Sequence, residues 1–122
     1  MKLDDLKQVL INSYSAKTCH EEYKEEFKQN KFRGQCVVTA LIVQDYFGGK
    51  ILRTEIDGER HSHYFNEIDG KTIDLTAEQF GLAPEYKNVE ERNREKLLSD
   101  RNTENRYKVL TNSVKDEFCK RG

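Results

Sequence analysis

The sequence lacks an excess of either charge, and this absence narrows the partners that the chain can have. Its 122 residues include 21 basic and 22 acidic side chains, so the formal net charge is −1 at pH 7. Basic and acidic residues also interleave along the chain, as in residues 90–96. A surface without a field of one sign attracts neither nucleic acid nor an anionic membrane strongly. We therefore expect no nucleic-acid partner and no membrane partner.

The chain also lacks a long hydrophobic run. No segment approaches the roughly 20 apolar residues that a membrane-spanning helix needs. The N-terminal sequence MKLDDLKQVL does not have the pattern of a signal peptide. These two features predict a cytoplasmic protein.

Cysteine is scarce, with three residues at Cys19, Cys36 and Cys119. An odd number of widely spaced cysteines fits neither a disulfide framework nor a zinc knuckle. We therefore expect no cofactor in the protein. Of the three, only Cys36 stands in a surrounding pattern that indicates a particular structure.

The chain does contain enough clustered apolar residues for one domain over residues 1–122. A domain of this length buries roughly two thirds of the surface of its unfolded chain. Hydrophobic periodicity and turn residues predict, in chain order, helices over 3–14, 20–29 and 35–47, strands over 50–56, 60–68 and 71–75, a short helix over 77–80, and helices over 88–98 and from 103 onward. The predicted fold class is α+β, with a buried central helix on a small antiparallel three-stranded sheet and helices from both ends of the chain beside it.

The least typical segment is residues 33–43, which read RGQCVVTALIV. Seven of the eight residues from Cys36 to Val43 are apolar, so we expect a helix that is buried on most sides. Cys36 then lies in the first turn of that helix. Unpaired N–H groups and the helix dipole at this end favour a thiolate.

A predicted hairpin brings a histidine and an acid together. Asp69 and Gly70 form the preferred two-residue turn. Pairing outward from this turn places Phe65 opposite Asp74, and His63 shares their face because it is two residues from Phe65. The Cβ atoms of a diagonal pair are about 7 Å apart, so the imidazole of His63 can reach the carboxylate of Asp74.

These positions suit nucleophilic catalysis by a thiol. Such a site needs a nucleophile, a base within reach and donors for the oxyanion. Cys36 would be the nucleophile, His63 the base and Asp74 the group that orients the imidazole. The N–H of Cys36 and the side-chain amide of Gln35 would bind the oxyanion.

Two other interpretations of the same residues stay open. Cys36 can be a small buried residue and His63 a structural one, since both are common uses of these side chains. Alternatively, a strand would place His61 and His63 on one face, where Cys36 or Asp74 could complete a zinc site. We rank the zinc site below nucleophilic catalysis, because only one candidate thiol and one acid complete it.

Residues 33–80 also carry strings that resemble a known family. The segments GQCVVTALIVQDYFGGKILRT and SHYFNEIDGKTIDLTAEQF resemble the YunG-like family of small bacterial proteins, whose pattern has GQC, VQDYFGG, a Ser-His-Tyr-aromatic-Asn string, a hairpin turn and an Asp-Leu-Thr segment ending in Gln-Phe. Residues 33–80 are therefore the motif-bearing core of the domain.

The order of Cys36, His63 and Asp74 is in turn similar to transglutaminase-like and papain-like thiol enzymes. That similarity implies a papain-like core and acyl transfer or amide hydrolysis on a small-molecule or peptide substrate. The chain departs from papain-like enzymes in its short length, and in Gln35, which is adjacent to the cysteine rather than several residues before it. A non-catalytic binding protein on a degenerate thiol-enzyme fold is the alternative function.

Overall fold

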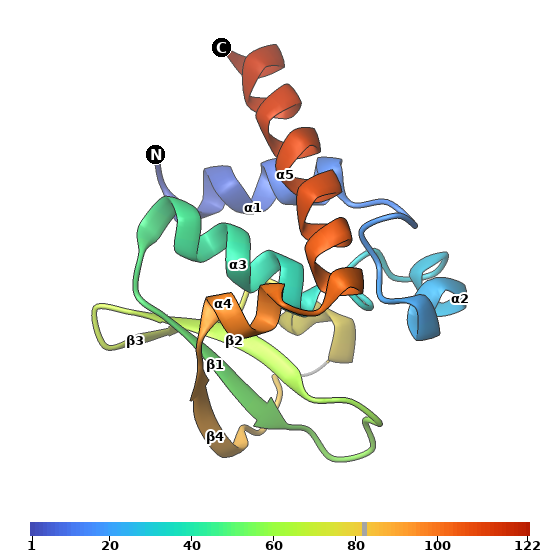
Figure 1. The fold of residues 1–122 in the computed structure, drawn as a ribbon, viewed down its shortest axis with the longest axis vertical. Helices are drawn as coiled ribbons and strands as arrows, with labels where there is room; N and C mark the ends of the chain where they lie inside the picture. Colours follow the sequence, from blue (N-terminus) through green and yellow to red (C-terminus); the bar gives the residue numbers. More distant parts are fainter. Residues whose placement is uncertain (82) are drawn as a thin grey trace.

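The computed structural model describes residues 1–81 and 83–122 and has the predicted α+β architecture (Figure 1). Its elements, in chain order, are α1 (Leu3–Ser13), the 3-10 helix η1 (Glu21–Tyr23), α2 (Lys24–Phe27), α3 (Cys36–Phe47), β1 (Lys50–Glu55), β2 (His63–Ile68), β3 (Lys71–Ile73), the 3-10 helix η2 (Ala77–Phe80), β4 (Lys87–Arg92), α4 (Arg94–Leu98) and α5 (Arg101–Arg121). No helix in this part of the chain is long and apolar enough to cross a bilayer.

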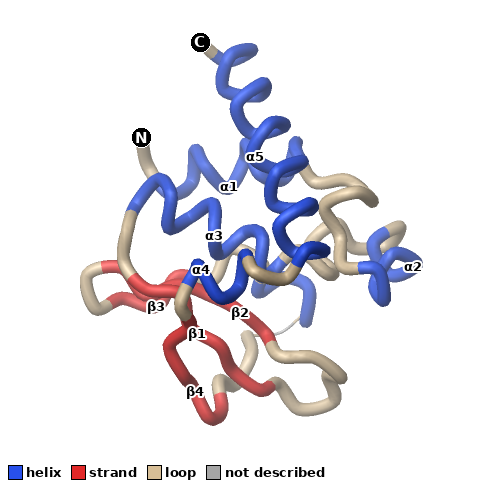
Figure 2. Tube along the Cα trace, in the orientation of Figure 1, coloured by secondary structure: helices blue, strands red, loops and turns tan. Residues whose placement is uncertain are grey.

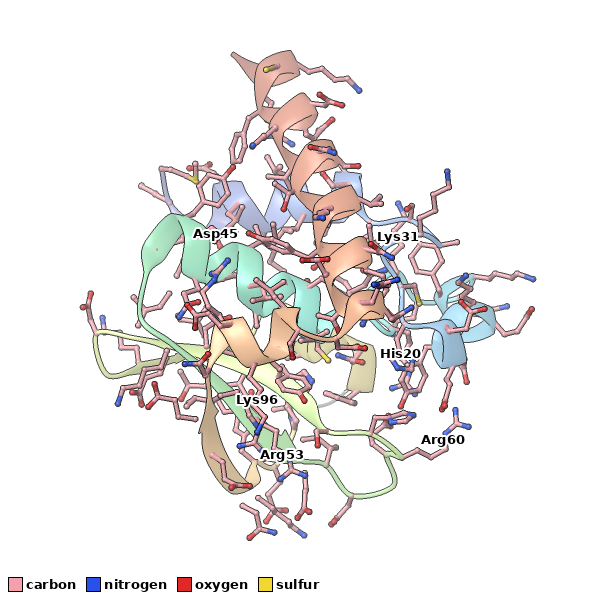
Figure 3. The ribbon with its side chains drawn as sticks, in the orientation of Figure 1. His20, Lys31, Asp45, Arg53, Arg60 and Lys96 are labelled. Atoms are coloured by element: carbon pink, nitrogen blue, oxygen red, sulfur yellow. The ribbon has the colours of Figure 1, made fainter. Side chains whose placement is uncertain are left out.

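The sheet has four antiparallel strands in the order β3-β2-β1-β4, so the prediction of three strands is wrong. The fourth strand, β4, occupies the first part of the segment where a polar helix over 88–98 was predicted, and only the last part of that segment is helical, as α4. Four of its six residues are exposed, so its side chains show no alternation of apolar and polar residues. It is an edge strand that is held by backbone pairing with β1 and by contacts such as that of Arg53, labelled in Figure 3, with Glu90. Charged side chains are a common feature of edge strands because they oppose pairing with other chains.

The β2–β3 hairpin has the predicted register. Asn66 pairs with Ile73, and Ile68 pairs with Lys71. Asp69 and Gly70 both have positive φ angles, 52° and 76°, as a type I′ turn requires. Because this turn is tight, the positions of residues on the two strands are fixed relative to each other.

Helix α3 forms the middle layer between the sheet and the helices α1 and α5 (Figure 2). On one side its residues Val38 and Ile42 pack in a cluster with Leu10 of α1 and Leu110 of α5. On the other side, Leu41 packs in a second cluster against the sheet. The prediction of a helix buried on most sides is thus confirmed, and this burial holds the first turn of α3 in a fixed place.

The helix predicted over 20–29 is shorter than expected. The segment over 20–29 contains only the short helices η1 and α2. Most of its residues are charged or polar, and Tyr23 alone is buried. The few apolar contacts that this segment makes explain why it does not extend into a long helix, since packing supplies most helix stability in proteins.

Candidate functional site

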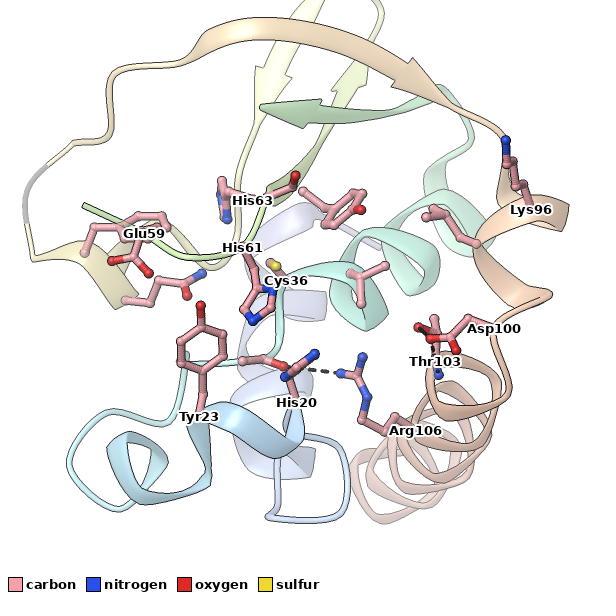
Figure 4. Close-up of a pocket in the computed structure, with 17 residues that line it drawn as sticks. His20, Tyr23, Cys36, Glu59, His61, His63, Lys96, Asp100, Thr103 and Arg106 are labelled. Atoms are coloured by element: carbon pink, nitrogen blue, oxygen red, sulfur yellow. Dashed lines mark hydrogen bonds between the residues drawn. The ribbon is translucent and has the colours of Figure 1, made fainter. Parts of the chain in front are cut away.

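A pocket of about 360 Å³ opens where the first turn of α3, the start of β2 and the first turns of α5 meet (Figure 4). Cys36 and His63 both line it. The sequence placed these two residues in one hypothetical site, and the structure brings them to one pocket wall. Asp74 is not one of the residues that line the pocket, and it is hydrogen-bonded to the ring of His63.

Cys36 is the first residue of α3 and is a free, partly buried thiol. The preceding residue, Gln35, is at the N-cap position but gives no side-chain hydrogen bond to the helix. The N–H groups of the first turn have no partner within their helix, so they keep their hydrogen-bonding capacity next to the thiol. Together with the helix dipole, they create a positive potential at Cys36.

Gly34 determines how the chain approaches Cys36. Its φ angle is +74°, and a Cβ atom at this position would lie 2.6 Å from Cys19 Sγ and 3.0 Å from His20 N. Only glycine combines this backbone conformation with so close an approach. The segment that leads into α3 is therefore packed directly on Cys19 and His20, which fixes the place of Cys36.

Cys19 differs from Cys36 in its surroundings. It is 1% exposed, and its thiol donates to the carbonyl oxygens of His20 and Arg33, each at 3.3 Å. Burial raises the pKa of the Cys19 thiol to about 11. Cys19 is therefore a protonated structural thiol at neutral pH.

His63 is 2% exposed and is held through one ring nitrogen only. Nε2 donates to Asp74 Oδ2 at 2.7 Å, which leaves Nδ1 as the free nitrogen. Nδ1 is buried and has no hydrogen-bond partner of regular geometry among the described residues. The edge of Phe80 contacts the ring, with 4.8 Å between the two ring centroids, and restricts its movement.

The charge state of His63 depends on its two neighbours. Burial lowers the pKa of the imidazole, but interactions with Asp74 and with the Cys36 thiol outweigh burial and raise it to about 9. The thiol is thus close enough to interact with the ring, although the contact is not a regular hydrogen bond. Loose contacts of this kind are common in active sites without substrate.

Asp74 follows directly after β3 and accepts hydrogen bonds on both oxygens. Oδ1 accepts from the backbone N–H of Thr76 at 3.2 Å and from its hydroxyl at 3.4 Å. Oδ2 accepts from His63 and from the hydroxyl of Tyr86 at 2.8 Å. These donors fix the carboxylate, and the carboxylate in turn fixes the imidazole. The prediction that Asp74 reaches His63 is confirmed.

Gln35 is completely buried, and its side chain is bonded to the loop after α1. Its Oε1 accepts from the hydroxyl of Thr18 at 2.8 Å, and Nε2 donates to Ser15 O at 3.4 Å. These contacts tie the loop to the start of α3. The oxyanion-binding role of the Gln35 side chain stays a prediction, while the N–H groups of the first turn of α3 remain as donors beside Cys36.

His61 lies outside β2, because the strand begins at His63 rather than at residue 60. Its side chain is 42% exposed and bonds to Glu22 Oε2 at 2.6 Å. The two histidines therefore do not share a strand face as predicted, and they bind different partners. Among residues 1–81 and 83–122, no three or more His, Cys, Asp or Glu side chains are grouped as metal ligands would be. The geometry does not support the zinc alternative.

Sequence reasoning missed two residues of this region. Tyr86, which donates to Asp74, lies in an irregular segment before β4 and has no sequence signal that points to its role. Arg106 lines the pocket and is 5% exposed. It did have a signal, because Thr103, Arg106, Leu110 and Val114 are spaced as one buried helix face.

The fold and the site define a class of protein. It is an α+β domain in which a cysteine at the start of a helix and a histidine line the same pocket, and a carboxylate is hydrogen-bonded to that histidine. The chain belongs to the YunG protein family, whose family model matches residues 2–119. The family match therefore extends beyond the motif-bearing residues 33–80 and includes the helices on both sides.

A protein of Bacillus subtilis (strain 168), described as uncharacterized protein YunG, is 44% identical to this chain over 71 residues. The alignment covers 58% of this chain and 59% of the relative, so it spans about three fifths of each. No solved structure matches the chain.

Proposed function

We propose that this protein is a cysteine-dependent hydrolase or acyltransferase that acts on an amide or thioester. Cys36 is the nucleophile, His63 the base and Asp74 the residue that positions His63. The observation that carries the proposal is the state of His63, a buried imidazole with Nε2 held by Asp74 and Nδ1 free beside Cys36. A purely structural histidine at this depth would have both nitrogens bonded.

The geometry supports a two-step reaction. The proton of the Cys36 thiol is held on Nδ1 of His63 in a thiolate–imidazolium pair, which the raised pKa of this imidazole favours. Sγ forms a bond to the carbonyl carbon of the substrate. The electron pair of the carbonyl moves to oxygen, where the N–H groups of the first turn of α3 stabilise it. The tetrahedral intermediate collapses, the bond to the amine or thiol breaks, and Nδ1 returns the proton to this leaving group. Water or a second nucleophile, deprotonated by the same nitrogen, then releases the acyl group from Cys36.

The order of the three residues along the chain supports the same proposal. A cysteine at a helix start, followed by a histidine and an acid on successive strands, is similar to transglutaminase-like and papain-like enzymes. In this chain the acid lies just after its strand. The pocket volume of about 360 Å³ suits a small molecule or the end of a peptide rather than a long chain.

Alkylation by iodoacetamide tests the proposal without knowledge of the substrate. We expect Cys36 to react at least tenfold faster than Cys119 at pH 7, because a thiolate and not a thiol is the nucleophile. His63→Ala should lower the rate at Cys36 by about 100-fold, which is typical for loss of a general base. His61→Ala is the matched control and should leave the rate unchanged. The rates follow from mass spectrometry of peptides that contain each cysteine.

The non-catalytic binding protein predicts the opposite result. In that case Cys36 reacts no faster than Cys119, and His63→Ala has no specific effect on it. Equal rates in the unmodified protein would end the catalytic proposal.

A further inference from the structure

Arg106 of α5 is a buried cation in the wall of the pocket. Its residue exposure is 5%, and it lies on the same buried helix face as Leu110 and Val114. Arginine is rarely buried without a charged partner, because removal of the guanidinium from water is costly. Its presence on an otherwise apolar face therefore needs an explanation.

The hydrogen bonds of Arg106 account for only part of its guanidinium. Nε donates to Asn102 Oδ1 at 3.0 Å, and Nη1 donates to the carbonyl oxygens of Thr18 and Gly34 at 3.3 and 3.4 Å. The bond to Asn102 lies within α5, and the two Nη1 bonds join α5 to the segments around Cys19 and Cys36. Nη2 forms no hydrogen bond to any described residue.

Nη2 is also accessible. In the described part of the chain, the buried polar side-chain atoms without a partner are His63 Nδ1 and Thr111 Oγ1, and Nη2 is not one of them. Arg106 lines the pocket and is otherwise covered by protein, so Nη2 retains its surface on the pocket side. Figure 4 shows the guanidinium of Arg106 at the pocket wall, where Nη1 donates to the carbonyl oxygen of Gly34 at 3.4 Å.

No carboxylate of the described residues forms an ion pair with Arg106. Asp100, the N-cap residue of α5, also lines the pocket, but its Oδ2 accepts from the N–H and hydroxyl of Thr103. Burial lowers the pKa of Arg106, while negative charge on nearby groups opposes this effect. The positive charge of the Arg106 guanidinium is therefore only partly compensated by the protein. An anionic group of a ligand in the pocket would compensate the rest.

The position of this group relative to Cys36 is defined by the backbone. Gly34, which accepts from Nη1, is two residues before Cys36, and both Arg106 and Cys36 line the same pocket. An anion at Nη2 would thus lie close to a carbonyl carbon that Sγ attacks. The other ionisable groups that line the pocket include both bases and acids: Lys96, His20, His61, His63, Glu59 and Asp100.

We infer that Arg106 is a substrate-binding residue, and that the substrate is an amide or thioester with a free carboxylate close to the bond that Cys36 attacks. A carboxylate fits better than a phosphate, because the single free Nη2 end of one guanidinium compensates one negative charge better than two. This inference rests on the proposed function, since it places the carboxylate relative to the attack by Cys36. The C-terminal residue of a peptide has such a carboxylate close to its amide bond.

Two alkylating reagents of similar size test the inference. Iodoacetate carries a carboxylate and iodoacetamide is neutral, and both transfer their methylene carbon to Sγ with loss of iodide. The quantity to measure at Cys36 is the rate constant for iodoacetate divided by that for iodoacetamide, in the folded protein and in the urea-unfolded chain. The ratio should be about tenfold higher in the folded protein, as expected for one charge-assisted contact. Arg106→Gln should remove most of this difference, and Arg106→Lys should keep part of it.

Arg60→Gln is the control for net charge. Arg60 extends from the loop between β1 and β2 (Figure 3), its side chain is 64% exposed, and it is not one of the residues that line the pocket. This variant loses the same charge and should keep the ratio of the unmodified protein. An unchanged ratio in Arg106→Gln would overturn the inference.

A second measurement covers the case in which Arg106→Gln does not fold. In the unmodified protein, sodium acetate should slow alkylation of Cys36 by iodoacetamide more than sodium chloride at equal ionic strength, and an equal effect would count against the inference. The two proposals fail separately. If iodoacetamide reacts equally with Cys36 and Cys119, the proposed function fails; if Cys36 is fast and depends on His63 but not on Arg106, only the carboxylate subsite fails.

Discussion

Two histidines that are two residues apart, His61 and His63, lie in contrasting regions of one pocket. His63 begins β2, pairs with Thr54 of β1 and is bonded to Asp74 in the protein interior. His61 belongs to the loop before the strand, has a partly solvent-exposed side chain and is bonded to Glu22. The start of the strand is thus the boundary between a rigid interior and a solvated part of the pocket, which is formed by His61, His20 and Tyr23 and is called the rim below. Side chains on rigid elements hold catalytic geometry better than side chains on loops.

The contrast extends to the aromatic groups around each histidine. His63 lies between Phe65 and Phe80, which exclude water from the ring. His61 lies 5.1 Å from His20 and 5.9 Å from Tyr23, ring centroid to ring centroid, at the mouth of the pocket. Burial lowers the pKa of His20, whereas Asp74 and Cys36 raise that of His63. The interior is therefore built to hold a charged imidazole and the rim is not.

The largest expected effect is a dependence of stability on pH that comes from His63. Its pKa is about 9 in the folded protein and about 6.5 in the unfolded chain. The folded state binds the proton more tightly, so the stabilisation is complete below pH 6.5 and is lost as the pH rises through 9. The free energy of unfolding should fall by about 3 kcal/mol across this range. Urea unfolding at pH 6 and pH 9.5 measures the change.

His63→Gln should flatten this dependence, whatever its effect on stability at a single pH. His61→Gln should keep the full dependence of the unmodified protein. If both variants keep the dependence, or both lose it, the distinction between interior and rim is not electrostatic.

The next effect concerns Gly34, where the rim segment with Cys19 and His20 packs on the start of α3. Gly34→Ala should lower the free energy of unfolding by about 2–3 kcal/mol, because strain at positive φ adds to the contact with Cys19. Gly58→Ala is the matched control, since Gly58 has a φ angle of +83° and nothing within 4 Å of an added Cβ. It should cost about 1 kcal/mol. Equal losses in urea unfolding would mean that the close packing at Gly34 adds nothing.

Sequence reasoning predicted the interior region around His63 and the start of α3 well. The Asp69-Gly70 turn is a local signal, and it fixes the register that brings His63 to Asp74. The apolar run after Cys36 likewise defines where α3 begins. Both features depend on residues that are close in sequence, which is why periodicity and turn chemistry could predict them.

The parts that sequence reasoning missed depend on contacts between distant segments. β4 is a strand because its backbone pairs with β1, although its charged side chains have no strand pattern. Tyr86 reaches Asp74 only through the path of the chain after η2. Arg106 joins the pocket because α5 packs across α3, some 70 residues after Cys36 in the sequence. Tertiary contacts of this kind override local propensity.

A smaller effect is expected at Tyr86, whose hydroxyl donates to Asp74 Oδ2. Tyr86→Phe removes one of the donors to the carboxylate and keeps the ring that stacks on Phe65, with 4.3 Å between centroids. The free energy of unfolding should fall by about 1 kcal/mol, as is usual for one hydrogen bond. The alkylation rate of Cys36 should change less than in Asp74→Asn, which alters the direct partner of His63. A larger loss of reactivity in Tyr86→Phe would place Tyr86 among the residues that position His63.

The smallest effect is expected at the rim itself. His61→Ala removes the contact with Glu22 and part of the aromatic cluster with His20 and Tyr23, all at a solvated surface. Exposed ion pairs contribute little, so the melting temperature should move by less than about 2 °C. Differential scanning calorimetry at pH 7 measures the shift, with Tyr86→Phe as the comparison from the interior. A shift at His61 as large as that at Tyr86 would show that the rim is part of the rigid framework, and the loop before β2 would then hold the pocket open as firmly as the strand does.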